Sequence, residues 1–171
     1  MQPVEGRGQL MIDTTLRSWK DNANRIVKFF GALSPEQLEQ EVAPGRNRLI
    51  YLWGHIAAVN DGLFPLLGLG PRHYPEMEAM FVTNPDRAPI TIYSAVELKE
   101  AWNHINEKLL VAFIGWSPAD WLARHTAVSA EEFGREPHRN RYAAMLSRNM
   151  HMTYHFGQAI LAKPRDPQAE G

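Results

Sequence analysis

Residues 12–30 of the chain, IDTTLRSWKDNANRIVKFF, carry an apolar side chain at every third or fourth position. This spacing matches the 3.6-residue turn of an α-helix, so the apolar side chains share one face that can pack against a core. Gly31 follows the stretch directly and predicts the end of the helix. The fold is therefore expected to be built from amphipathic helices.

A second segment, residues 49–66, repeats the same period after a turn at Pro44. Asn47 precedes the segment and is the expected N-cap, because a short amide side chain can accept a hydrogen bond from the first free backbone N–H groups. Pro65 lies near the end of the segment and is expected to kink or end the helix.

Two more helices are expected further along the chain. The third spans residues 94–115 and opens with Ser94 followed three residues later by a glutamate, which is a capping-box pattern. The fourth spans residues 140–162, and Pro164 is expected to stop it. Its apolar side chains spread around much of the helix, which predicts that it is the most central of the four.

The connection between the second and third helices, residues 68–93, is roughly 26 residues long and contains four prolines, far more than a tight link in a compact domain needs. Strand signals are nearly absent, and Ser-Pro pairs at residues 34–35 and 117–118 predict short helical turns. We therefore expect an all-α fold, a four-helix bundle with a long crossover between the second and third helices. One domain is expected over residues 1–171, with a core of about residues 10–163.

The composition limits the classes of function. The 171 residues contain no cysteine, which excludes disulfides, thiolate metal sites and a cysteine nucleophile. Eighteen basic and nineteen acidic residues give a net charge of −1 without long charge runs, which argues against nucleic-acid binding. The first residues lack a signal-peptide pattern, and no apolar run of about 18 residues predicts a membrane span, so a cytoplasmic protein is expected.

Three histidines are the residues best suited to chemistry. His151 and His155 lie four positions apart, so on a helix their rings project from one face about 6 Å apart and can converge on one ion. His55 lies beside the apolar stripe of the second helix, where an ionisable ring needs a hydrogen-bond partner or a ligand. Each histidine taken alone is equally compatible with a structural role.

The sequence resembles the DinB-like (DinB/YfiT-like) family of metalloenzymes. The resemblance lies in Gly54-His55-Ile56-Ala57 and in the stretch at residues 151–158, HMTYHFGQ, and the order and lengths of the helices agree over about residues 10–163. It implies that His55, His151 and His155 are metal ligands. Zinc or nickel is the implied ion, which agrees with three neutral nitrogen donors and no carboxylate.

The resemblance also implies a class of activity. Similar proteins include thiol transferases that use bacillithiol or related low-molecular-weight thiols, and maleylpyruvate-isomerase-like enzymes that use mycothiol or glutathione. A metal-activated thiol would attack a small electrophilic substrate, and hydrolysis by metal-bound water is the nearest variant. Catalytic and cofactor-binding residues beyond the three histidines are not assigned.

Other interpretations stay open at this stage. The chain could be a non-catalytic, dimeric metal- or ligand-binding bundle with a sensor or stress role, or the histidines could be polar neighbours that bind no metal. A homodimer is compatible with each of the metal-binding interpretations. Asn60, Asp61 and Tyr154 are near the histidines in the sequence and could support them, although capping, solvation or packing explains each one as well. His73 could cover the site from the crossover.

Overall fold

A computed structural model describes residues 4–88 and 93–162 of the chain. These residues form helices and no β-strand, which confirms the predicted all-α class. The helices are α1 (Val4–Phe30), α2 (Pro35–Leu38), α3 (Leu49–Asp61), α4 (Leu63–Leu67), α5 (Glu76–Glu78), the π-helix η1 (Ala79–Thr83), α6 (Ala95–Ile114), α7 (Pro118–Leu122), α8 (Ala130–Arg135) and α9 (Arg141–Ala162). In this part of the chain, no helix has the combined length and apolarity of a membrane span.

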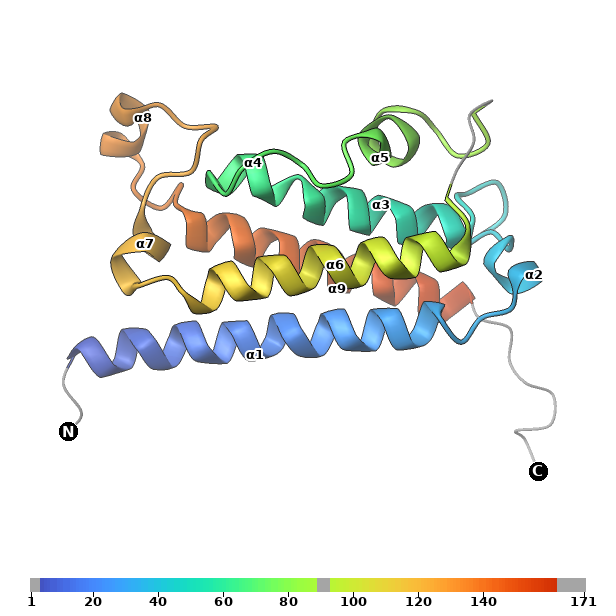
Figure 1. The fold of residues 1–171 in the computed structure, drawn as a ribbon, viewed down its shortest axis with the longest axis horizontal. Coiled ribbons are helices and arrows are strands. Elements are labelled where there is room, and N and C mark those ends of the chain that lie inside the picture. The colour runs from blue at the N-terminus through green and yellow to red at the C-terminus, as the bar shows by residue number, and fades with distance from the viewer. Residues whose placement is uncertain (1–3, 89–92, 163–171) are drawn as a thin grey trace.

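The long helices enclose a core that is rich in aromatic side chains. Helices α1 and α3 each pack against both α6 and α9, while α5 and η1 lie against α3 on the side away from α1 (Figure 1). Four tryptophans are exposed by no more than 1%: Trp19, Trp53, Trp102 and Trp121. Phe30 stacks on Trp53 with ring centroids 5.3 Å apart, which joins α1 to α3.

Serine capping boxes begin several helices, because each serine accepts a backbone hydrogen bond while the acid or amide three residues on accepts one in return. The boxes predicted at Ser34, Ser94 and Ser117 are confirmed. A fourth, at Ser129, begins α8, which the sequence analysis did not predict. Pro164, the expected stop of α9, lies outside the described residues.

The predicted N-cap at Asn47 is wrong. The cap of α3 is Arg48, and its side chain makes no capping hydrogen bond. The backbone explains the difference, because the Leu49 N–H donates to the Gln40 carbonyl, and the Asn47 carbonyl accepts from Val42. The residues before α3 form backbone hydrogen bonds with one another, so the Leu49 N–H at the start of the helix has a partner without an amide side chain.

The second predicted helix is interrupted, as expected from Pro65. Helix α3 ends at Asp61, whose carbonyl would need the N–H that Pro65 lacks, and Pro65 is the third residue of the separate helix α4. The prediction that the fourth helix is the most central is wrong. The most buried helix is α3, with 11 of its 13 residues buried, whereas α9 buries 4 of its 22. The broad apolar surface of α9 therefore lies partly in solvent.

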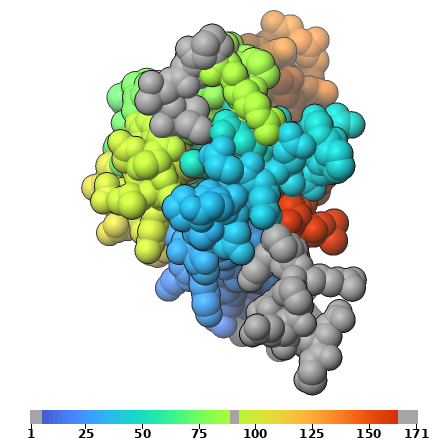
Figure 2. All heavy atoms as spheres, turned by 90° about the vertical axis from the view of Figure 1, so that its right-hand side faces the viewer, coloured from blue at the N-terminus to red at the C-terminus, as the bar shows by residue number. Residues whose placement is uncertain are grey.

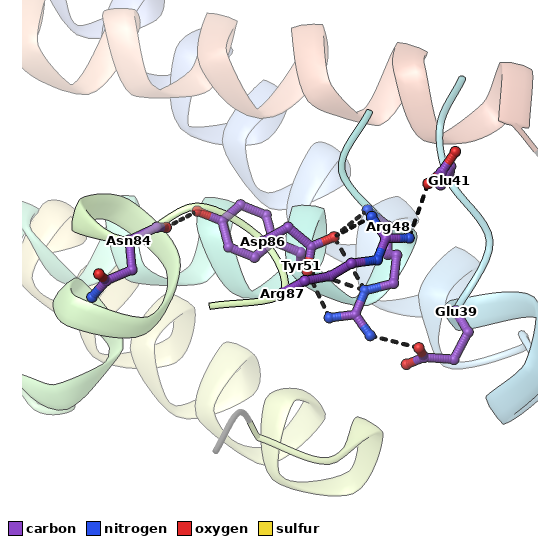
Figure 3. A network of polar contacts seen from close by, with 7 residues as sticks. All are labelled: Glu39, Glu41, Arg48, Tyr51, Asn84, Asp86 and Arg87. Atoms are coloured by element: carbon purple, nitrogen blue, oxygen red, sulfur yellow. Dashed lines mark hydrogen bonds and ion pairs between the residues drawn. The ribbon is translucent and has the colours of Figure 1, made fainter. Parts of the chain in front are cut away.

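An arginine ties the chain after η1 to the start of α3 (Figure 3). The Arg48 side chain donates to Asp86 and Glu39, and its backbone N–H also donates to the Asp86 carboxylate at 2.8 Å. Burial alone would raise the pKa of Asp86, but the hydrogen bonds from Arg48 outweigh it and lower that pKa. Nearby, the Tyr51 hydroxyl donates to the Asn84 carbonyl at 2.6 Å. These contacts fix the end of η1 over α3.

We expect the substitution Asp86→Asn to lower the free energy of unfolding by about 1–3 kcal/mol, because the half-buried Arg48 would lose its buried charged partner and keep only the exposed Glu39. Urea denaturation at pH 7 measures this change. Glu131→Gln is the matched control, since Glu131 forms an exposed ion pair with Arg135 and its loss should cost less than about 0.5 kcal/mol. Equal effects of the two substitutions would contradict the anchoring role of Asp86.

Candidate metal centre

Two helices bring the three predicted histidines together. On α9, His151, His155 and Gln158 follow at intervals of four and three and share one face, while Met152 of the same helix is buried in the core. His55 lies on α3, which packs against α9. The convergence that the sequence predicted for the three rings is therefore present in the structure, and each ring is half-buried.

The Nε2 atoms of the three rings face one another. The Nε2 atom of His151 lies 3.1 Å from that of His155 and 3.3 Å from that of His55. One ligand nitrogen from each histidine can be chosen so that all three lie within 4.8 Å of one another. An ion about 2.0–2.1 Å from two nitrogens separates them by about 2.9 Å in octahedral geometry and about 3.4 Å in tetrahedral geometry. The two spacings measured from His151 both lie between these values.

The opposite ring nitrogens fix the tautomers of two histidines. The Nδ1 atom of His55 lies 2.8 Å from the Phe81 carbonyl oxygen, and the Nδ1 atom of His155 lies 2.8 Å from Oε1 of Gln158. Because both oxygens only accept hydrogen bonds, each Nδ1 carries the hydrogen and donates it. Each Nε2 is then a bare lone pair directed at the other rings.

This arrangement fits a metal ion better than it fits hydrogen bonding alone. When all three rings are neutral, only Nε2 of His151 can carry a hydrogen, and it can donate to one of the two neighbouring lone pairs at a time. Nδ1 of His151 is buried and has no hydrogen-bond partner among the described residues. A cation at the meeting point of the rings would satisfy every inward nitrogen at once. The donor set of three imidazoles and no carboxylate suits zinc or nickel.

The surroundings keep the imidazoles of His151 and His155 neutral, which is the form that binds metal. Burial, with smaller effects of His155, His55 and Arg148, lowers the pKa of His151 to about 4. Burial also lowers the pKa of His155, against the hydrogen bond to Gln158, which by itself would raise it. At pH 7 both rings therefore have free lone pairs for a ligand role.

A glycine allows η1 to reach His55. A Cβ atom on Gly54 would lie 2.3 Å from the ring of Phe81, so only glycine permits this ring to pack on α3. The same residue, Phe81, supplies the carbonyl that orients His55. Since π-helical turns are often found at functional sites, η1 is notable for placing this carbonyl at the histidine cluster.

The field around the cluster is positive. Arg148 lies one turn before His151 on the same side of α9, and its half-buried side chain has no ion-pair partner among the described residues. Burial and the charge of Arg72 lower the pKa of Arg148. Arg72 itself donates to the Ala58 carbonyl and pairs with Glu78. An anion at the cluster would therefore be favoured over a second cation.

The residues considered as supports for the histidines lie elsewhere or contact only one ring. Asn60 is fully buried and donates to Asn106 and Met152, and Asp61 accepts the backbone N–H groups of His73 and Tyr74. Tyr154 is 64% exposed and its ring lies beside His155.

The other histidines considered do not join the cluster. His73 does not cover the site, because its exposed ring packs between Phe64 and His104. His104 is half-buried, and its Nδ1 lies 2.9 Å from the Tyr74 hydroxyl.

The hydrogen-bond acceptors that orient the rings of His55 and His155 were not predicted from the sequence. Gln158 could have been found, because it follows His155 by three positions and so lies on the same helical face. The Phe81 carbonyl could not have been found, because it lies in the crossover, 26 residues after His55, and every residue has a backbone carbonyl. Gly54 belongs to the motif at residues 54–57, but only the three-dimensional structure shows that its missing side chain leaves room for the Phe81 ring.

Comparison with family models gives a match over most of the chain. A family model described as the DinB superfamily matches residues 18–159, which include all three histidines. No curated protein matches the chain.

The substitution Gly54→Ala is expected to lower the free energy of unfolding by about 1–3 kcal/mol, because the added methyl would overlap the Phe81 ring. Thermal and urea denaturation measure the change. Gly157→Ala is the matched control, since Gly157 is an exposed glycine of α9 with open space around its Cβ position, and alanine there should be neutral or stabilising. A neutral Gly54→Ala variant would refute the packing argument.

Metal-free protein should lose stability as the pH falls from about 6.5 toward 4. The unfolded chain binds a proton at His151 near the ordinary pKa of 6.5, whereas the folded protein binds it only near about 4, so acid favours unfolding across this window. Urea midpoints at pH 7.5, 6 and 5 measure the trend. His151→Gln should show a smaller loss over the same range, and an identical loss would contradict the assignment to His151.

Proposed function

The chain belongs to the DinB superfamily, and from that premise we propose that it is a metal-dependent enzyme whose ion is held by His55, His151 and His155. The observation that carries the proposal is the meeting of three Nε2 atoms with a spacing suited to one ion. Three protein ligands leave at least one coordination position for water or substrate, as in catalytic rather than structural sites.

The favoured reaction is transfer of a low-molecular-weight thiol to a small electrophilic substrate. A bound zinc or nickel ion would supply the positive charge that keeps a thiol deprotonated, or that lowers the pKa of a water molecule toward 7. The thiolate sulfur would then form a bond to the electrophilic carbon, and the leaving group would depart with the bonding electron pair. Hydrolysis is the nearest variant.

The protein's own groups support the thiol variant. The Phe81 carbonyl and Gln158 hold the imidazoles in the tautomer that presents Nε2, and Arg148 adds positive charge that favours an anionic sulfur. Asp61, which could have served as a general base, is occupied by two backbone N–H groups. A thiol held by such an ion would lose its proton to solvent water, so this reaction would need no separate protein base to create the nucleophile.

The architecture that we propose for this function is a four-helix bundle of α1, α3, α6 and α9 in a single domain over residues 1–171. The contacts of α1 and α3 with both α6 and α9 support it.

We also propose a cytoplasmic homodimer. The support for pairing is an apolar stripe on α9 that remains in solvent, formed by Leu146, Met150 and Tyr154. A non-catalytic dimeric metal-binding bundle with a sensor or stress role would use the same surface.

Protein purified without a His-tag should contain about one equivalent of zinc or nickel by elemental analysis. His55→Ala and His151→Ala should each lose most of it, because two imidazoles hold the ion far more weakly than three. His104→Ala is the control, since this histidine pairs with Tyr74 away from the cluster. Full metal content in both cluster variants would remove the site.

The reaction class is tested with the metal-loaded protein and an electrophile such as 1-chloro-2,4-dinitrobenzene. The thiols to be compared are bacillithiol, mycothiol and glutathione, with p-nitrophenyl acetate as a probe of hydrolysis. Metal-dependent product formation with one thiol, lost in His151→Ala, would support the transferase. Ester hydrolysis without thiol would favour the hydrolase, and a metal-loaded protein inactive in both assays would favour the non-catalytic bundle.

A further inference from the structure

A cavity of about 560 Å³ opens beside His155. Its walls come from the segment between α2 and α3 and from the last turns of α9, and Figure 2 shows these two parts of the chain side by side on one face of the molecule. The volume lies within the range of small-molecule sites, about 300–1,000 Å³. His155 and Gln158 line the cavity, so it adjoins the histidine cluster.

One part of the wall is apolar. Val42, Leu52 and Leu161 contribute their side chains, and Leu161 is 87% exposed to solvent. From His155 to Leu161 the wall runs about 9 Å along the helix axis, at about 1.5 Å per residue. An extended chain of about six carbons is shorter than this wall and fits along it, and a ligand of that kind would cover the exposed leucine.

The charge that lines the cavity is positive. Arg46 lines it, no acidic residue does, and His155 is kept neutral by burial. The Arg46 side chain has no hydrogen bond or ion pair with any residue that the structure describes. Arg48, two positions further on, is by contrast held by Glu39 and Asp86. Arg46 is therefore available to a ligand, and its planar donors match a carboxylate.

We propose that this cavity binds an amphipathic monoanion, with its carboxylate at Arg46 and its apolar chain along Leu52 and Leu161. The end of the ligand that faces His155 would be the end that reacts, a part of the proposal that rests on the proposed function. The site thereby selects substrates whose negative charge is separated from the reacting group by an apolar chain.

Titration of metal-free protein with hexanoate and with hexan-1-ol tests the proposal, followed by the amide NMR signals of residues 46–47 and 154–158. Hexanoate should bind about three- to tenfold more tightly than hexan-1-ol, because only the carboxylate can pair with Arg46. Arg46→Gln should abolish this preference and Arg46→Lys should keep most of it. Arg17→Gln, at an exposed arginine of α1 that does not line the cavity, is the control and should change nothing.

A second variant tests the apolar wall. Leu161→Ser removes an exposed side chain without disturbing the core, and it should weaken hexanoate and hexan-1-ol alike by several-fold while preserving their ratio. Equal binding of the two ligands to the native protein, or a preference that survives Arg46→Gln, would overturn the proposal. The titration uses no metal, so it tests ligand binding in the cavity separately from the proposed function. If the protein prefers hexanoate but binds no metal ion, the binding proposal is supported and the proposed metal-dependent activity is refuted.

Discussion

The central constraint in this molecule is the crowding of three imidazole nitrogens that cannot all be satisfied by one another. The Nε2 atoms of His55 and His155 carry lone pairs and lie 3.3 and 3.1 Å from Nε2 of His151. The His151 atom can carry only one hydrogen to share between them. Half-buried polar groups in this position would be costly without a partner. A small cation would resolve the conflict, and the groups around the rings hold them in place.

The supports for the rings come from different levels of structure. Gln158 orients His155 from within the same helix, so the rigidity of α9 sets that contact. Phe81 orients His55 from the crossover, and this contact exists because Gly54 leaves room for the Phe81 ring and because Arg48 and Asp86 anchor the chain that follows η1. Two of the ligand positions thus share one rigid element, whereas the third depends on how a separate segment packs.

The charges along the α3 and α9 surfaces suit this site to anionic ligands. Arg148 lies toward one end of the cluster and Arg46 lines the cavity at the other, while burial lowers the pKa values of His151 and His155 and keeps both rings neutral. The carboxylates near these arginines are largely engaged elsewhere, Glu78 with Arg72 and Asp86 with Arg48. A thiolate and a carboxylate on the same small molecule would find complementary charge along this path.

The sequence alone determined the long helices and several of their starts, because helical period and capping are local and recur every few residues, as in residues 12–30 and at Ser94. It also placed His151 and His155 on one face. It misjudged the start of α3 and the burial of α9, which depend on contacts with distant segments. The pairing of His55 with α9 could be expected from the sequence only through a family resemblance. Only the tertiary structure decided the Phe81 carbonyl, the clearance at Gly54 and the cavity at Arg46, because packing between segments far apart in the chain creates them.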